Sequence, residues 1–150
     1  MKRLPLQSGP TAWLPTMLFL KKKIALCLIG YLFVSACQQN PYRDGADLYK
    51  SQCANCHMDS GEGLSALIPT LAKSDYLEKN REKLPCILWH GLQDTISVNG
   101  RMYAEQMPPN LALTEVDITN ILNFVNTTWG NQNPLYTLEE VKKALEKCPK

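Results

Sequence analysis

The residues best suited to chemistry in this sequence form the segment CANCH at positions 53–57. Two cysteines and a histidine within five residues could form a redox-active dithiol, a disulfide or half of a zinc site, and each predicts a different function. The choice depends first on the redox compartment, because disulfides persist in oxidising surroundings and are rare in the cytosol.

The N-terminal segment has the pattern of an export signal. Three lysines at 21–23 precede an apolar run over residues 24–34, and small residues lie just before Cys37. The apolar run is shorter than the roughly 20 residues that a permanent membrane helix needs, which favours cleavage. The sequence VSAC at 34–37 resembles the lipobox of bacterial lipoproteins, and this resemblance implies a lipid anchor on Cys37. An ordinary secreted protein cleaved near Ala36 is the alternative.

The predicted signal peptide and lipid anchor divide the chain into three parts. Residues 1–36 would contain an upstream extension and the lipoprotein signal peptide. The extension ends at residue 16, because a normal signal peptide could start at Met17. Residues 37–43 would hold the lipidated cysteine and a short tether, and residues 44–150 one folded domain. The lipoprotein resemblance implies that this domain lies in the periplasm or at the cell surface of a bacterium. Gln38, where many lipoproteins have the aspartate that retains them at the inner membrane, favours the outer membrane.

The charge of the mature domain argues against nucleic acid as a partner. The chain has 16 basic and 14 acidic residues, but five of the basic residues precede Cys37. The part from Cys37 onward therefore has 11 basic and 14 acidic residues, a net charge of −3. Without a basic face to bind phosphates, the expected partners are proteins or small redox carriers.

The segment at 53–57 matches Cys-x-x-Cys-His, the attachment motif of c-type haem. Cys53 and Cys56 would form thioether bonds to the haem vinyl groups, and His57 would ligate the iron. Two intervening residues let the two sulfurs reach neighbouring pyrrole edges. A thioredoxin-like dithiol would need a βαβ context, and a zinc site a second close pair of ligands, and the sequence has neither. The sequence therefore predicts one covalent haem c.

The elements expected around this motif are helical. Helix candidates occupy residues 44–53, 68–80, 81–91, 114–129 and 137–148. The last two begin at Thr114 and Thr137, each followed by an acidic residue three positions on, as in a capping box. Pro85 either starts or bends the third. The segment 92–110 is irregular, and no strand is convincing. The expected fold class is all-α, with about four or five short helices, and a bound cofactor would add to a small core.

Over residues 44–129 the sequence resembles class I c-type cytochromes. Gly45 and Tyr49 lie eight and four residues before Cys53, at the family's glycine and aromatic positions, and Phe124 has the aromatic position of the C-terminal helix. The resemblance implies a cytochrome c-like fold around one haem. It also implies a close helix crossing at Gly45, with Tyr49 and Phe124 in contact.

The same resemblance implies the axial ligands of the iron. Pro69 lies twelve residues after His57, where the family has a proline whose carbonyl oxygen orients the axial histidine. Met107, which is followed by a proline in an irregular loop, matches the family's thioether ligand. Such a ligand favours reduced iron and raises the potential. Met102 is an alternative sixth ligand, and His90 would give a bis-histidine haem of lower potential.

Further residues are expected near the haem propionates. The family resemblance assigns the segment with Asn99, Arg101 and Tyr103 to this region. Arg101 could pair with a carboxylate, and Tyr103 or Trp89 could donate a hydrogen bond. Each of these residues could equally be an ordinary surface or core residue.

Cys86 and Cys148 are the cysteines that the signal, the anchor and the haem motif leave over. Oxidising surroundings and the absence of other partners favour a disulfide between them, which would tie the last helix to the domain. Two free buried thiols are the alternative.

These features predict an electron-transfer protein that passes single electrons through a His/Met-ligated haem c. Its partners would be an oxidase, reductase or dehydrogenase, and the lipid on Cys37 would hold it at a membrane. It would act as a monomer or as one subunit of a complex. The alternatives are a haem enzyme or a gas or redox sensor with a labile sixth ligand, and a cytochrome subunit of a larger respiratory complex.

Overall fold

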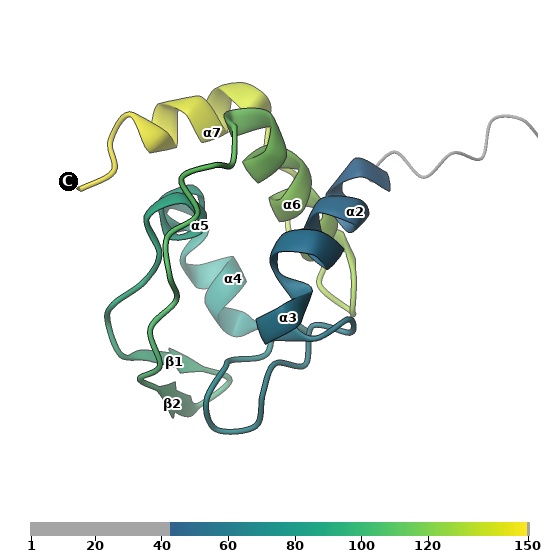
Figure 1. Ribbon diagram of the computed structural model, residues 1–150, viewed down its shortest axis with the longest axis vertical. Helices are drawn as coiled ribbons and strands as arrows, with labels where there is room; N and C mark the ends of the chain where they lie inside the picture. The colour runs from purple at the N-terminus through teal and green to yellow at the C-terminus, as the bar shows by residue number, and fades with distance from the viewer. Residues whose placement is uncertain (1–42, 150) are drawn as a thin grey trace, which may run out of the picture. The chain divides into compact units, whose positions relative to one another are not determined.

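The computed structural model describes residues 43–149 (Figure 1). The predicted extension and signal peptide at 1–36 and the lipid anchor at Cys37 lie outside these residues and stay predictions. Within the described residues, no helix is both long and apolar enough to cross a membrane.

The described part of the chain is mostly helical, as the sequence predicts. It has six α-helices, one 3-10 helix and one two-stranded sheet. In chain order these are α2 (Arg43–Gln52), α3 (Ala54–His57), α4 (Asp75–Lys79), η1 (Arg81–Lys83), α5 (Leu84–His90), β1 (Ile96–Val98), β2 (Arg101–Tyr103), α6 (Glu115–Thr127) and α7 (Leu138–Leu145). The expected helix at 68–80 is confined to α4, and Pro85 lies in the first turn of α5, where it starts the helix rather than bending it.

The hairpin of β1 and β2 was not expected from the sequence, which showed no convincing strand. The strands pair antiparallel, with Val98 opposite Arg101 across the two residues Asn99 and Gly100. Both turn residues have positive φ, 50° and 78°, which is the backbone of the tight hairpin turn that Asn-Gly favours. Each strand has only three residues, too few for a period-two pattern to be visible in the sequence.

Helices α2 and α6 pack against each other through a close crossing (Figure 1). A Cβ added to Gly45 would lie 2.9 Å from both the carbonyl carbon of Asn120 and the Cβ of Phe124, so only glycine fits. The Tyr49 ring packs on Phe124, with centroids 5.5 Å apart, and on Trp129, at 4.8 Å. The close crossing at Gly45 and the Tyr49–Phe124 contact are therefore confirmed.

Helix α6 forms the centre of the core. It begins with a capping box in which the Thr114 hydroxyl accepts from the Asp117 backbone N–H and the Asp117 carboxylate accepts from Thr114. The buried apolar side chains around it come from α2, α4, α5, α6 and the C-terminal segment: Tyr49, Leu77, Leu84, Ile118, Ile121, Leu122, Val125, Tyr136 and Val141.

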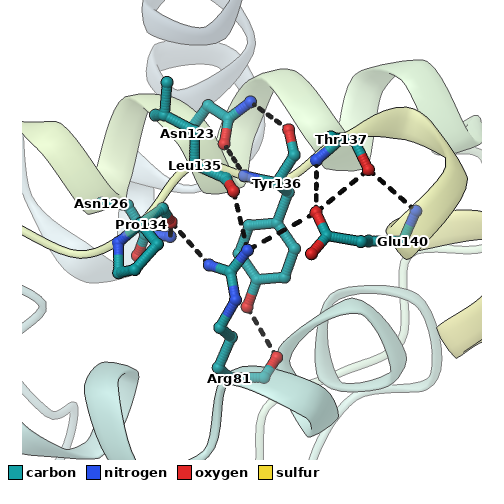
Figure 2. Close-up of polar contacts among 8 residues, drawn as sticks. All are labelled: Arg81, Asn123, Asn126, Pro134, Leu135, Tyr136, Thr137 and Glu140. Atoms are coloured by element: carbon teal, nitrogen blue, oxygen red, sulfur yellow. Dashed lines mark hydrogen bonds and ion pairs between the residues drawn. The ribbon is translucent and has the colours of Figure 1, made fainter.

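The C-terminal segment is held to the domain by polar contacts around Arg81 (Figure 2). The Arg81 guanidinium donates to the carbonyl oxygens of Pro134 and Leu135 and lies 3.7 Å from the centre of the Tyr136 ring. The Tyr136 hydroxyl donates to the Arg81 carbonyl at 2.6 Å. These bonds satisfy the polar groups of the segment that leads into α7.

The segment that follows helix α7 is tied to α5 by a covalent bond. Cys86 and Cys148 form a disulfide across 62 positions of sequence. Thr137 and Glu140 start α7 with a second capping box, and these hydrogen bonds from Thr137 lower the pKa of Glu140. The helix buries Val141 completely against the core.

Candidate functional site

The two cysteines and the histidine of the CANCH segment meet in one cleft. Helix α3 continues from α2 through a turn in which the Tyr49 carbonyl accepts from the Cys53 N–H at 2.8 Å. The Cys53 carbonyl then accepts from the N–H groups of Cys56 and His57, at 3.1 and 2.9 Å. This one-turn helix brings all three side chains to the cleft, with Cys53 half-buried and Cys56 exposed.

The cleft itself has a predominantly apolar lining that comes from distant parts of the chain. Its aliphatic walls belong to the loop before α4, to α4 and α5, to the hairpin and to α6. Besides Met107 and three tyrosines, the apolar lining residues are Leu67, Ile68, Pro69, Leu71, Leu77, Leu84, Ile87, Leu88, Leu92, Ile96, Val98, Pro108, Ile121, Leu122 and Val125.

His57 is oriented by the residue that the sequence assigned to this role. Its Nδ1 lies 3.2 Å from the carbonyl oxygen of Pro69. Because a carbonyl only accepts, Nδ1 carries the proton and Nε2 keeps its lone pair. Burial lowers the pKa of His57, an effect that the Pro69 hydrogen bond opposes, and the neutral ring is the form that binds a metal.

Gly63 supports this arrangement and was not found from the sequence. Its N–H donates to the His57 carbonyl at 3.1 Å, and a Cβ at this position would lie 2.6 Å from the Pro69 carbonyl oxygen. A side chain at position 63 would therefore displace the carbonyl that orients the histidine. The sequence shows a glycine-rich loop here, but not what the glycine touches.

Met107 lies in the same cleft, and the competing ligands do not. The Met107 backbone is held by a pair of hydrogen bonds to Leu92, each 2.9 Å long. Met102, on β2, is 62% exposed and is absent from the cleft lining. His90, at the end of α5, is exposed and lines a different groove, beside α7.

The residues expected near the propionates separate into two groups. Tyr103 is buried and lines the cleft. Arg101 is exposed and outside the lining, with Nη1 3.4 Å from the Ser65 carbonyl oxygen. Asn99 and Asp75 exchange two hydrogen bonds. The Asp75 backbone N–H donates to Oδ1 of Asn99, and the Asn99 backbone N–H donates to the Asp75 carboxylate. The buried Nε1 of Trp89 has no hydrogen-bond partner among the described residues, but Trp89 does not line the cleft either.

These observations fit a haem and disfavour the alternative uses of the motif. A predominantly apolar cleft with two cysteines, a neutral imidazole and a thioether matches the ligands and surroundings of a c-type haem. In the described part of the chain, no three His, Cys, Asp or Glu side chains gather to hold a metal ion such as zinc. Burial raises the pKa of Cys53 to about 11, whereas a reactive dithiol needs a lowered thiol pKa.

Comparison with known proteins gives the same assignment. Residues 42–129 match the cytochrome c family. Cytochrome c-552 of Thermus thermophilus is 38% identical over 109 residues, which cover 67% of this chain and 82% of that protein. The cytochrome c subunit of a quinone alcohol dehydrogenase from Gluconacetobacter polyoxogenes is 34% identical over 92 residues, 60% of this chain but 19% of the relative. The chain therefore belongs to the cytochrome c family, as a class I member that binds one haem c covalently through Cys53 and Cys56.

Proposed function

We propose that this domain carries single electrons between redox proteins, with the haem iron held by His57 and Met107. The observation that carries the proposal is that one apolar cleft is lined by both of these side chains and by both motif cysteines. Met102 and His90, the other candidate ligands, lie outside that lining. With two protein ligands bound, no coordination position remains for a substrate.

The haem supplies a one-electron couple between ferrous and ferric iron. The chain contributes fixed ligands and a dry site. The Pro69 carbonyl keeps the proton of His57 on Nδ1, so that Nε2 is the donor atom. The hydrogen bonds to Leu92 hold the Met107 backbone, and a thioether ligand favours the reduced state and raises the potential.

A second arrangement keeps this chemistry and changes the partner. One of the relatives is a cytochrome c subunit of a quinone alcohol dehydrogenase, which supports a role as a subunit of a larger dehydrogenase or respiratory complex. Helix α7 lies beyond the residues that match the family. It exposes Glu139, Lys142 and Lys143, and we assign such a contact to this side of the helix. Copurification with an enzyme complex from membranes would favour this arrangement, and recovery of the free chain alone would count against it.

We further propose that the domain is exported and held at a membrane by a lipid on Cys37. The support is the signal-like sequence before Cys37. Cell fractionation of the full chain and of its Cys37→Ala variant tests this tether, since the variant should leave the membrane fraction.

Absorption spectra of the haem-loaded protein test the ligand assignment. We expect the oxidised protein to show the weak far-red band of sulfur-ligated ferric haem, and Met107→Ala to lose it because the thioether is gone. Met102→Ala is the matched control, since that side chain is exposed, and it should keep the band. A wild-type spectrum without the band, or a band that survives in Met107→Ala, would overturn the assignment.

A further inference from the structure

The loop that carries Met107 is bound to the C-terminal end of α5 through backbone atoms. The N–H and carbonyl of Leu92 exchange two 2.9 Å hydrogen bonds with those of Met107. The Asn110 N–H donates to the Trp89 carbonyl at 3.1 Å. These bonds bracket position 91, so the residue there determines how closely the loop can approach the helix end.

Gly91 ends α5 and faces this loop directly. Its N–H donates to the Ile87 carbonyl at 2.9 Å, and its φ of +77° is a conformation that side chains rarely adopt. A Cβ built on Gly91 would collide with the Met107 carbonyl oxygen and lie 2.8 Å from both the carbonyl carbon of Pro108 and the nitrogen of Pro109. All three are backbone atoms, which cannot rotate away as the end of a flexible side chain could.

We propose that Gly91 is a positioning residue for the Met107 thioether, acting by letting the ligand loop lie directly against the end of α5. This inference rests on the proposed ligation by Met107. Ordinary contact begins at about 3.4 Å, so any side chain at position 91 would push the Pro108 and Pro109 backbone outward by about 0.6 Å or more. Ligand geometry of this kind tolerates displacements of only about 0.5 Å.

The cysteines and His57 belong to a different part of the site. Gly91 is not among the residues that line the cleft, and the three atoms nearest to a Cβ built there all belong to the Met107 loop. Replacing Gly91 by a larger residue should therefore free the Met107 thioether from the iron. The covalent haem attachment, the His57 ligand and the helical fold should remain.

Gly100 provides a control for the positive φ within the same chain. Its φ is +78°, nearly that of Gly91, but a Cβ at this position would meet no atom within 4 Å. Gly100→Ala shares the positive φ, but the ψ of Gly91 is −171°, a backbone region that essentially only glycine occupies, so Gly91→Ala adds further backbone strain as well as the collision with the Met107 loop. A difference between the two variants reports the collision and the added strain together, and both act where the end of α5 meets the Met107 loop.

The experiment compares the haem-loaded wild type, Gly91→Ala and Gly100→Ala. We expect wild type and Gly100→Ala to keep the far-red band of the ferric protein. Gly91→Ala should lose the band, show a lower reduction potential, and bind carbon monoxide faster in the ferrous state, with the wild-type far-ultraviolet circular dichroism. A residue needed only for general stability would not change the band in a folded variant.

Two results would overturn the role of Gly91 and leave the Met107 ligand assignment standing. One is a folded Gly91→Ala that keeps the band at wild-type intensity. The other is a Gly91→Ala that does not fold while Gly100→Ala does, because Gly91 would then serve the whole fold rather than the ligand loop. A wild-type protein without the band, or a band that persists in Met107→Ala, would instead remove the ligand assignment and with it this inference.

Discussion

Asn131 illustrates how one buried side chain holds the segments around the cleft. Its Oδ1 accepts from the Ser74 N–H at 3.2 Å, and its Nδ2 donates to the carbonyl oxygens of Leu71 and Val125, both at 2.8 Å. These bonds join the loop that follows Pro69 to the end of α6. The amide is 7% exposed, so little water can replace it.

We expect Asn131→Ala to lower the free energy of unfolding by about 2–4 kcal/mol, because it leaves three buried backbone groups without their partner. Asn133→Ala is the control, since its amide makes one long hydrogen bond of 3.4 Å to Asn126 and is half-buried. It should cost less than about 1 kcal/mol. Urea unfolding of both variants measures this, and equal losses would contradict the role assigned to Asn131.

At the residue scale, the sequence could predict what depends on local spacing. Cys53, Cys56 and His57 form a motif within five positions, and the resemblance to class I cytochromes c implies the Pro69 contact, because the family has a proline at the same interval after the histidine. The contacts of Asn131 could not be predicted, because its partners are distant in sequence. Two methionines five positions apart also look alike in a sequence, and the hairpin is what turns Met102 to solvent.

At the scale of elements, the C-terminal helix is an addition whose attachment can be tested. The chain is fixed on both sides of helix α7. Before it, Leu135 accepts a hydrogen bond from Arg81 of η1 (Figure 2), and after it, Cys148 forms a disulfide with Cys86 of α5. Neither cysteine lines the cleft. The disulfide should therefore support stability without affecting the haem ligands.

We expect the double variant Cys86→Ala, Cys148→Ala to lose as much as about 4 kcal/mol of unfolding free energy, the loop-entropy estimate for a loop of this length. The far-red band should be unchanged. Dithiothreitol added to the ferrous protein is the matched test, because the haem is then already reduced and dithiothreitol cleaves the disulfide but not thioether bonds. It should destabilise the wild type and leave the double variant unaffected. A double variant that unfolds at the same urea concentration as wild type would contradict this.

Some elements were predictable and others were not, for reasons of length and range. Helices α6 and α7 are capped by Thr114 and Thr137, and each capping box consists of residues only three positions apart, so the sequence shows it directly. The hairpin at 96–103 has strands too short for a pattern. The close approach of the Met107 loop to Gly91 is a contact between segments, and no local signal records it.

At the scale of the whole molecule, the described helices surround a cleft that the chain alone fills only in part. A domain of this size has a small core, so a covalently bound haem adds apolar contact that the side chains lack. The all-α fold and the cytochrome c resemblance could both be predicted, because the haem motif and the flanking helix positions are local features.

We propose that this protein carries electrons with its iron bound by both His57 and Met107. A spectroelectrochemical titration of the haem-loaded protein, with carbon monoxide added to the ferrous form, is the decisive measurement. We predict a reversible one-electron transition, a low-spin spectrum in both states, and no carbon monoxide binding on the timescale of mixing. A high-spin spectrum with rapid carbon monoxide binding by the native protein would contradict the claim and favour a sensor or haem enzyme.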